Sequence, residues 1–311
     1  MTGLVTNPPY RGRFAPSPTG SLHFGSLVAA LGSYLDARHR GGEWLVRMED
    51  LDRTREVEGS AALILRTLEG FGFHWDGEAL YQSRRTEAYA VALEAMTRAG
   101  LSYPCGCSRR EITEKADTGS EGPIYPGTCR KGLADDGTTH SIRMLTDDRV
   151  IEVRDAIQGP VRQNLAREIG DFVIRRADGF HAYQLAVVVD DAWQEITHVV
   201  RGADLLSSTP RQCYLQQCLG LPRPDYAHLP LAVDDQGRKL SKQHQDAPVD
   251  PERPLEALLQ ALAFLNQPLP PERPASLDEF WRWSIAHWSL ATIPVKTELS
   301  VNDSPSTNSF L

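Results

Sequence analysis

Residues 13–27 read RFAPSPTGSLHFGSL and indicate how the chain begins to fold. They continue a short predicted strand over 10–16 and lead into a helix predicted over 24–40, where apolar residues recur at helical spacing. Between the two, prolines and a glycine force a tight, irregular turn. A second predicted strand follows at 43–49. This strand–turn–helix–strand order is typical of the start of an α/β nucleotide-binding sheet.

The turn places His23 and Gly25 where the helix begins. A helix N-terminus offers backbone N–H groups and a partial positive charge, which suit a phosphate. Gly25 allows a nucleotide to lie close to the backbone, and His23 is able to donate to a phosphate oxygen. Taken alone, the same residues also fit a tight turn with a capping histidine.

A second motif is the stretch RKLSKQ at 238–243, which follows Gly237 in a polar loop. Its lysines, Lys239 and Lys242, stand three residues apart. Such a loop can close onto a triphosphate and offset the charge that develops as pyrophosphate leaves. Taken alone, this motif also fits a solvated loop.

The remaining pattern alternates helices and strands with one interruption. Residues 103–130 break the rhythm with proline, glycine and three cysteines, and 140–155 are typical of antiparallel strands. Three tryptophans after residue 280 are expected to pack a terminal helix on the core. Further helices are predicted over 56–71, 84–99, 207–219 and 253–265, and further strands over 171–201 and 226–233.

Composition limits the classes of function. The chain has 33 Lys and Arg against 41 Asp and Glu, a net charge of −8, which argues against a non-specific nucleic-acid coat but allows a local basic path. It holds no apolar run long enough to span a membrane and no signal-peptide core at its N-terminus. A cytoplasmic location is the default expectation. The five cysteines then predict free thiols or metal ligands in place of disulfides.

Three of those cysteines, Cys105, Cys107 and Cys129, cluster in the interrupted region. Zinc favours thiolates, and a structural site needs four ligands. The candidates for the fourth ligand are Tyr125, His140 and Asp117. Three free thiols remain the alternative.

The two loop motifs, in this order, resemble the HIGH and KMSKS signatures of class I aminoacyl-tRNA synthetases. The run at 13–27 is similar to the glutamyl-tRNA synthetase form of the first signature, and LVRMEDLDRTR (45–55) and ITHVVRGADLLSSTPRQ (196–212) resemble the same subfamily. The resemblance covers about 10–245 and implies a Rossmann-like α/β catalytic core. The chain reads KLSKQ where the second signature ends in serine, but both lysines are retained.

This resemblance implies a site for glutamate and ATP. Glutamate carries two carboxylates and one ammonium, so its pocket needs cations and an anion. By analogy Arg13 and Arg201 meet carboxylates, Glu49 meets the ammonium and Tyr183 supplies a hydroxyl. The implied glutamate site is Arg13, Phe14, Ala15, Pro16, Ser17, Glu49, Tyr183 and Arg201, and the implied ATP site, used with Mg²⁺, is His23, Gly25, Lys239 and Lys242.

The cysteine region resembles the zinc element of a short glutamyl-synthetase paralogue, in which a tyrosine completes the tetrahedron. That resemblance favours Tyr125 beside Cys105, Cys107 and Cys129 and implies one structural zinc ion. Only 69 residues follow Lys242, too few for an anticodon-reading domain of full glutamyl-tRNA synthetases. Both features point to the glutamyl-queuosine tRNA(Asp) synthetases, which attach glutamate to the cyclopentenediol of queuosine. The expected partners are ATP, L-glutamate and tRNA(Asp) carrying queuosine, and the expected state is a monomer.

We expect six segments on this basis. They are a loose leader (1–9), a first Rossmann half (10–102), a zinc-binding insertion (103–155), a second Rossmann half with the KLSK loop (156–245), a short helical C-terminal segment (246–294) and a disordered tail (295–311).

Three alternatives remain open from the sequence. The chain fits an ordinary glutamyl-tRNA synthetase core that needs an anticodon-binding partner. It also fits a small-molecule nucleotidyltransferase that adenylates carboxylates, or a non-catalytic, zinc-bearing RNA-binding module.

Overall fold

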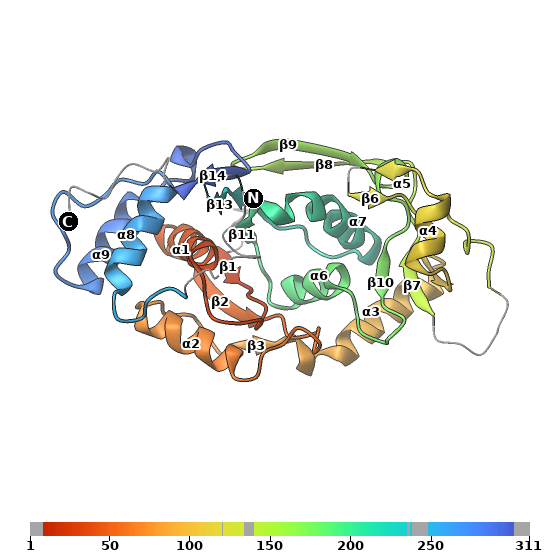
Figure 1. Cartoon of the computed structure of the whole chain (residues 1–311), viewed down its shortest axis with the longest axis horizontal. Helices are drawn as coiled ribbons and strands as arrows, with labels where there is room; N and C mark the ends of the chain where they lie inside the picture. The colour runs from red at the N-terminus through yellow and green to blue at the C-terminus, as the bar shows by residue number, and fades with distance from the viewer. Residues whose placement is uncertain (1–8, 120, 134–139, 235–236, 238–247, 302–311) are drawn as a thin grey trace, which may run out of the picture.

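The computed structural model describes residues 9–119, 121–133, 140–234, 237 and 248–301 (Figure 1). Three predictions therefore lie wholly or partly outside the described residues: the roles of Lys239 and Lys242 in the KLSK loop, the loose leader up to residue 8, and the disordered tail beyond residue 301.

The first elements follow the sequence prediction. β1 (Arg11–Phe14) and β2 (Glu43–Met48) pair in parallel, with α1 (Phe24–His39) as the crossover between them. A parallel pair needs such a crossover. Ten of the 16 residues of α1 are buried, because other elements pack around most of this helix.

Two sheets, parallel except for the β8–β9 pair, meet at the centre of the molecule. One has the order β1-β2-β3 and the other β11-β12-β8-β9, and the Thr197 amide joins them by donating to the Arg11 carbonyl at 2.9 Å. The central order is thus β3-β2-β1-β11-β12, in which the strand sequence reverses beside β1, as in a doubly wound Rossmann-type sheet. The further strands are β3 (Leu80–Tyr81), β8 (Val150–Asp155), β9 (Gly159–Asn164), β11 (His198–Gly202) and β12 (Asp225–Leu229).

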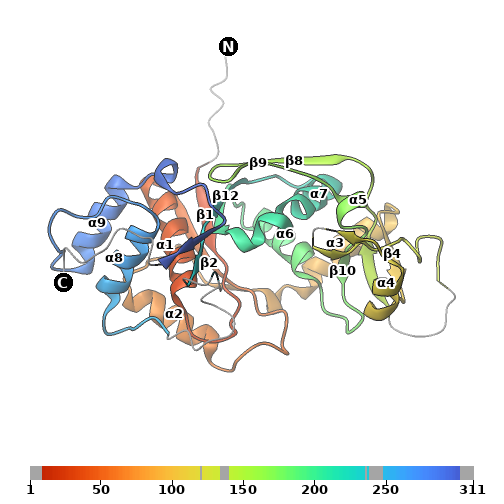
Figure 2. The same cartoon turned by 45° about the horizontal axis from the view of Figure 1, so that its top comes forward.

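Helices build two apolar cores beside this sheet. One core surrounds α1, β1 and β2 and includes the C-terminal helices α8 and α9, which lie beside α1 in both views (Figures 1 and 2). The other core joins α3, α6 and α7. These helices are α2 (Ser60–Gly70), α3 (Thr86–Arg98), α6 (Tyr183–Trp193), α7 (Thr209–Leu219), α8 (Pro254–Phe264) and α9 (Leu277–His287).

The predicted role of the late tryptophans is confirmed for Trp281 and Trp288, which are buried in the first core. Trp281 contacts Tyr34 and Phe73 at ring-centroid distances of 4.8 and 4.9 Å. Its indole N–H donates to the Phe71 carbonyl. The terminal helix is therefore part of the core that supports the first half of the sheet.

The interrupted region forms a small unit at the far end of the second core. An antiparallel sheet of order β10-β7-β4 carries it, with short helices α4 and α5 and the ribbon β5-β6. The strand β8 belongs to the central sheet and β10 to this smaller one, so the boundary expected at residue 155 does not separate the two sheets. The bounds are β4 (Ser102–Cys105), α4 (Arg109–Lys115), β5 (Thr118–Gly119), β6 (Gly122–Pro123), β7 (Ser141–Met144), α5 (Leu165–Glu168) and β10 (Val173–Arg175).

Three sequence predictions need correction. Residues 183–193 form α6 and not a strand, because their β-branched residues fill the second core as a helix. The one strand predicted over 226–233 is in fact two strands, β12 and β13 (Leu231–Val233), which Pro230 separates. The tail predicted to be disordered from residue 295 contains β14 (Glu298–Ser300), which pairs with β13 in parallel.

The strands predicted over 140–155 exist, but they do not pair with each other. β7 pairs with β4 and β10, whereas β8 pairs with β9 and β12. Within the described part of the chain, no helix is long and apolar enough to cross a membrane.

Candidate active site

A cavity of about 470 Å³ lies where the two halves of the sheet meet. Its walls come from the carboxyl ends of β1, β2, β11 and β12 and from the first turn of α1. In doubly wound sheets, ligands bind in the crevice at the point where the strand order reverses. The cavity is therefore the place where this fold provides a binding site.

All eight residues expected to bind glutamate line this cavity, as do His23 and Gly25 of the expected ATP site. They come from segments almost 190 residues apart in the chain, so the fold brings them together. The eight are Arg13, Phe14, Ala15, Pro16, Ser17, Glu49, Tyr183 and Arg201.

The loop after β1 is held by backbone hydrogen bonds to the neighbouring segments. The Glu49 amide donates to the Pro16 carbonyl at 2.9 Å, and the Val57 amide donates to the Pro18 carbonyl at 3.0 Å. The Ser60 hydroxyl, at the start of α2, donates to the Gly20 carbonyl. These contacts fix the irregular turn against the end of β2, so Glu49 faces the same cavity as the turn.

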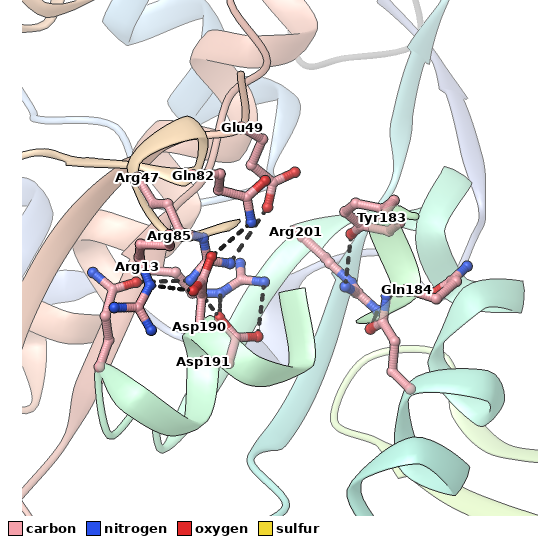
Figure 3. A network of polar contacts seen from close by, with 12 residues as sticks. Arg13, Arg47, Glu49, Gln82, Arg85, Tyr183, Gln184, Asp190, Asp191 and Arg201 are labelled. Atoms are coloured by element: carbon pink, nitrogen blue, oxygen red, sulfur yellow. Dashed lines mark hydrogen bonds and ion pairs between the residues drawn. The ribbon is translucent and has the colours of Figure 1, made fainter. Parts of the chain in front are cut away.

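A buried ion network supports one side of the cavity (Figure 3). Asp191 on α6 accepts from Arg13 Nε at 3.1 Å and from Arg47 Nη1 at 2.8 Å. The side chains of all three residues are at most 6% exposed. The side-chain amide oxygen Oε1 of Gln194 accepts from Arg47 as well. Asp191 therefore holds the Arg13 guanidinium through Nε and Nη2. It makes no hydrogen bond with Nη1 of Arg13.

Burial would raise the pKa of Asp191, but the Arg13 and Arg47 guanidiniums outweigh it and hold the pKa below its usual value. Sequence reasoning missed both Arg47 and Asp191. A signal for each was present: an arginine inside the apolar strand 43–48 and an aspartate pair at the end of an apolar run. Charges at such positions are buried and need partners.

Glu49 is the anionic group among the expected glutamate contacts. Its side chain is 10% exposed, and Oε1 accepts from Arg47 Nη2 at 3.4 Å. Burial raises the pKa of this carboxyl, while the nearby charges of Arg47 and Arg13 partly offset the rise. A ligand ammonium that reaches Glu49 would favour the ionised form, since an opposite charge stabilises it.

Arg201 and Tyr183 form the opposite wall (Figure 3). Arg201 Nη1 donates to the Tyr183 hydroxyl at 3.3 Å, and burial raises the pKa of that phenol. Arg201 as a residue is 5% exposed, and its guanidinium is held by further contacts to β12 and α7. The expected glutamate contacts in this cavity thus include two cations, Arg13 and Arg201, and one anion, Glu49, while Arg55 and Asp204 also line the cavity.

The N-terminus of α1 supplies a site suited to phosphate. His23 caps the helix, with Nδ1 accepting from the Ser26 amide at 3.3 Å and Nε2 lying 2.9 Å from the Ser26 hydroxyl. A Cβ on Gly25 would meet the His23 ring at 3.4 Å and otherwise face the cavity. The capping and the phosphate interpretations of this motif are therefore compatible.

The three clustered cysteines meet Tyr125 in the small unit. The Sγ atoms of Cys105, Cys107 and Cys129 lie within 4.8 Å of one another. The Tyr125 hydroxyl lies 3.3 Å from Cys105 Sγ and 3.7 Å from Cys107 Sγ. Neither His140 nor Asp117, the other candidates for a fourth ligand, belongs to this group of ligand atoms in the described ranges.

These spacings fit one tetrahedral ion. Zn–S bonds of about 2.3 Å and Zn–O bonds of about 2.0 Å give tetrahedron edges of about 3.5–3.8 Å. The Cys107 and Cys129 sulfurs are 3.5 Å apart, and the sulfur–hydroxyl distances bracket the expected edge. The four donors can therefore hold a metal ion, and with four protein ligands the site would be closed to substrate.

A cation lies beside this group. Arg143 Nε donates to Cys105 Sγ at 3.2 Å, and its guanidinium lies 3.9 Å from the centre of the Tyr125 ring. Burial would raise the pKa of the Cys105 thiol, but hydrogen bonds with Tyr125 and Arg143 lower it to about 7. Thiolates are the ligand form of cysteine, so this setting favours metal binding.

Residues 10–260 match the family model of the catalytic domain of class I tRNA synthetases (E and Q). The chain is 56% identical over 292 residues to the glutamyl-Q tRNA(Asp) synthetase of Dechloromonas aromatica (strain RCB), a match that covers 93% of this chain and 97% of that relative. It is 54% identical to the glutamyl-Q tRNA(Asp) synthetase of Chromobacterium violaceum, with 93% and 97% covered.

Two solved structures are also similar at 26% identity. The glutamate-tRNA synthetase of Elizabethkingia anophelis matches with a TM-score of 0.79, over 97% of this chain and 69% of that one. A glutamate tRNA ligase of Elizabethkingia meningosepticum in complex with its amino acid matches with a TM-score of 0.80, over 94% and 67%. Together with the cavity and its charges, these matches show that the chain belongs to the glutamyl-Q tRNA(Asp) synthetase family of class I aminoacyl-tRNA synthetases.

Proposed function

We propose that this chain activates L-glutamate with ATP and transfers it to queuosine in the anticodon of tRNA(Asp). The observation that carries the proposal is one cavity lined by every expected glutamate contact, among them the cations Arg13 and Arg201 and the anion Glu49. The near full-length relatives named for this activity support the tRNA part of the proposal.

Glutamate recognition follows from charge. Arg13 and Arg201 bind the two carboxylates, and Glu49 binds the ammonium. The Tyr183 hydroxyl, already hydrogen-bonded to Arg201, fixes the carboxylate on that side. Glutamine, which has the same shape but lacks one charge, would leave a buried guanidinium uncompensated and should be rejected.

ATP binds with its phosphates at the N-terminus of α1, beside His23 and Gly25. Lys239 and Lys242 stabilise the leaving pyrophosphate through their positive charges. Mg²⁺ bound with ATP neutralises phosphate charge.

Two displacements complete the reaction. A carboxylate oxygen of glutamate forms a bond to the α-phosphorus of ATP, and the bond to pyrophosphate breaks. A hydroxyl of the queuosine diol then forms an ester with the activated carbonyl, AMP leaves, and the hydroxyl proton is released. No protein nucleophile is needed, because positioning and electrostatics supply the catalysis.

Zinc is the ion we assign to Cys105, Cys107, Tyr125 and Cys129, where it would stabilise the small unit. We further propose that the small unit containing it, built on the sheet β10-β7-β4, helps place the tRNA. The leader, the two Rossmann halves and the short helical C-terminal segment remain proposed divisions of the chain. Since one chain supplies the whole cavity, a monomer suffices, and its tRNA substrate favours a cytoplasmic location.

The test is ATP–pyrophosphate exchange with glutamate, glutamine or aspartate as the only amino acid. Exchange should require glutamate, and Lys242→Ala should depress it strongly while the circular dichroism spectrum and melting temperature stay near those of the wild type. Equal exchange with glutamine, or no dependence on an amino acid, would contradict the proposed activity. Wild-type exchange in the Lys242 variant would exclude only the role of that lysine.

A further inference from the structure

The Arg201 guanidinium differs from that of Arg13 in its partners. Asp191 neutralises Arg13, whereas the partners of Arg201 among the described residues are all uncharged side chains and a carbonyl. A guanidinium carries five N–H donors and no acceptor. The donors of Arg201 contact His228 Nε2 at 3.0 Å, the Tyr183 hydroxyl at 3.3 Å, the Thr209 hydroxyl and Gln212 Oε1 at 2.8 Å each, and the Leu205 carbonyl.

The contact with His228 determines where that ring carries its proton. Because arginine cannot accept, His228 Nε2 must be the acceptor, so the proton of the neutral ring lies on Nδ1. Nδ1 lies 2.6 Å from Asp155 Oδ2 and donates to it. The side chains of both His228 and Asp155 are fully buried. A second proton, on Nε2, would set one N–H against another and break the contact with Arg201.

Asp155 is itself fixed from the opposite side. Its Oδ1 accepts from the backbone amides of Ile157, Gln158 and His228 at 3.0, 2.8 and 3.1 Å. These contacts leave Oδ2 as the atom that faces the ring. The chain of contacts therefore runs from the end of β8 through β12 to Arg201 on β11 and ends at the cavity wall.

We propose that Asp155 and His228 are positioning residues that aim the Arg201 guanidinium at a substrate carboxylate without neutralising it. A carboxylate in direct contact with Arg201 would compete with the substrate's own carboxylate. The neutral His228 ring lies between Asp155 and Arg201, so Asp155 does not contact the guanidinium and does not neutralise it. The proposal rests on the proposed function, since it takes the ligand of Arg201 to be a carboxylate of glutamate.

Two variants with an amide side chain at position 228 distinguish a positioning role of His228 from a role in packing alone. A glutamine amide reaches the place of Nε2 and can accept from Arg201, whereas an asparagine amide reaches only the place of Nδ1. His228→Gln should keep the KM for glutamate within about threefold, and His228→Asn should raise it about tenfold or more, the order of effect of a lost hydrogen bond to a charged group. The KM for ATP should change less than twofold in both.

Asp155→Asn is the second variant. Its oxygen stays with the three backbone amides, so its NH₂ faces Nδ1 and forces the proton to Nε2, against Arg201. This variant should raise the KM for glutamate as His228→Asn does. Its histidine ¹⁵N NMR spectrum should show the His228 proton moved from Nδ1 to Nε2.

The outcomes are separable. If His228→Gln and His228→Asn raise the KM for glutamate equally, or raise the KM for ATP in parallel, the pair acts only structurally and the proposal is overturned. A wild-type spectrum at pH 7 with the proton on Nε2, or on both nitrogens, overturns it without any assay of activity. Whether wild-type exchange requires glutamate tests the proposed function on its own.

Discussion

Replacing Asp191 with asparagine removes the carboxylate that Arg13 and Arg47 share, with almost no change in shape. The carboxylate oxygen lies 3.1 and 2.8 Å from the two guanidiniums, and the side chains are 3%, 0% and 6% exposed for Arg13, Arg47 and Asp191. Breaking such a buried pair by removing one partner costs about 3–5 kcal/mol of unfolding free energy. Arg13 would also lose the group that turns it toward the cavity.

The effect on activity can be estimated from the contact that we propose Arg13 makes with a carboxylate of glutamate. A hydrogen bond to a charged group contributes about 1.5–3 kcal/mol, equivalent to about 10- to 150-fold in the KM for glutamate. The assay is pyrophosphate exchange, with urea unfolding of the same samples. The KM for ATP should stay within about twofold, because we propose that Arg13 contacts the amino acid and not the nucleotide.

Asp190 is the matched control on the same helix. It is fully buried and pairs with Arg85 at 2.6 Å and with the Tyr89 hydroxyl, but it does not touch Arg13. Asp190→Asn should lose a similar amount of stability and keep the KM for glutamate. A wild-type KM in Asp191→Asn, or equal increases in both variants, would refute the positioning role of Asp191.

The stability difference should also depend on pH. The pKa of Asp191 lies below its ordinary value of 3.8, so its contribution is complete above that pH and is lost as the pH falls through the folded-state pKa. Wild type and Asp191→Asn should therefore converge in acid. A difference that persists after Asp191 is protonated would exclude charge pairing as its cause.

Three further variants test other parts of the site. Because burial raises the pKa of Glu49 above 4.5, the wild-type KM for glutamate should rise as the pH falls through that pKa. Glu49→Gln should give a KM about 10- to 150-fold higher that varies less with pH. A pH profile of the variant that matches that of the wild type would contradict the ammonium role of Glu49. Cys129→Ser should lower the bound zinc, measured by atomic absorption, from one ion per chain to well below one. Cys213→Ser in the second core should leave the zinc content unchanged. Equal zinc contents in the two variants would exclude the four-ligand site. Trp281→Ala should cost about 3–5 kcal/mol in urea unfolding, since it empties a buried aromatic contact, and a loss under 1 kcal/mol would contradict the packing of α9 on α1.

Local sequence patterns were sufficient to predict the elements that form the start of the cavity, namely β1, the turn after it and α1. The turn between β1 and α1 follows from its prolines and glycine, and the position of His23 follows from the helical periodicity after it. The residues of the glutamate site came from the resemblance, and the structure places them in one cavity.

What the sequence left open depends on contacts between distant segments. Arg47 and Asp191 are 144 residues apart, and Asp155 and His228 are 73 apart, so no local pattern pairs them. The helix at 183–193 has the β-branched composition of a strand, and only its place in the second core decides between the two. The strand at 298–300 forms because β13 offers an edge, which the polar composition of the tail does not reveal.

The central claim is tested most directly by transfer of labelled glutamate to two bulk tRNA pools. One pool comes from cells that make queuosine and the other from cells that cannot. The account predicts label only in the queuosine-containing pool. Equal labelling of both pools would mean that the acceptor is not queuosine and would contradict the account.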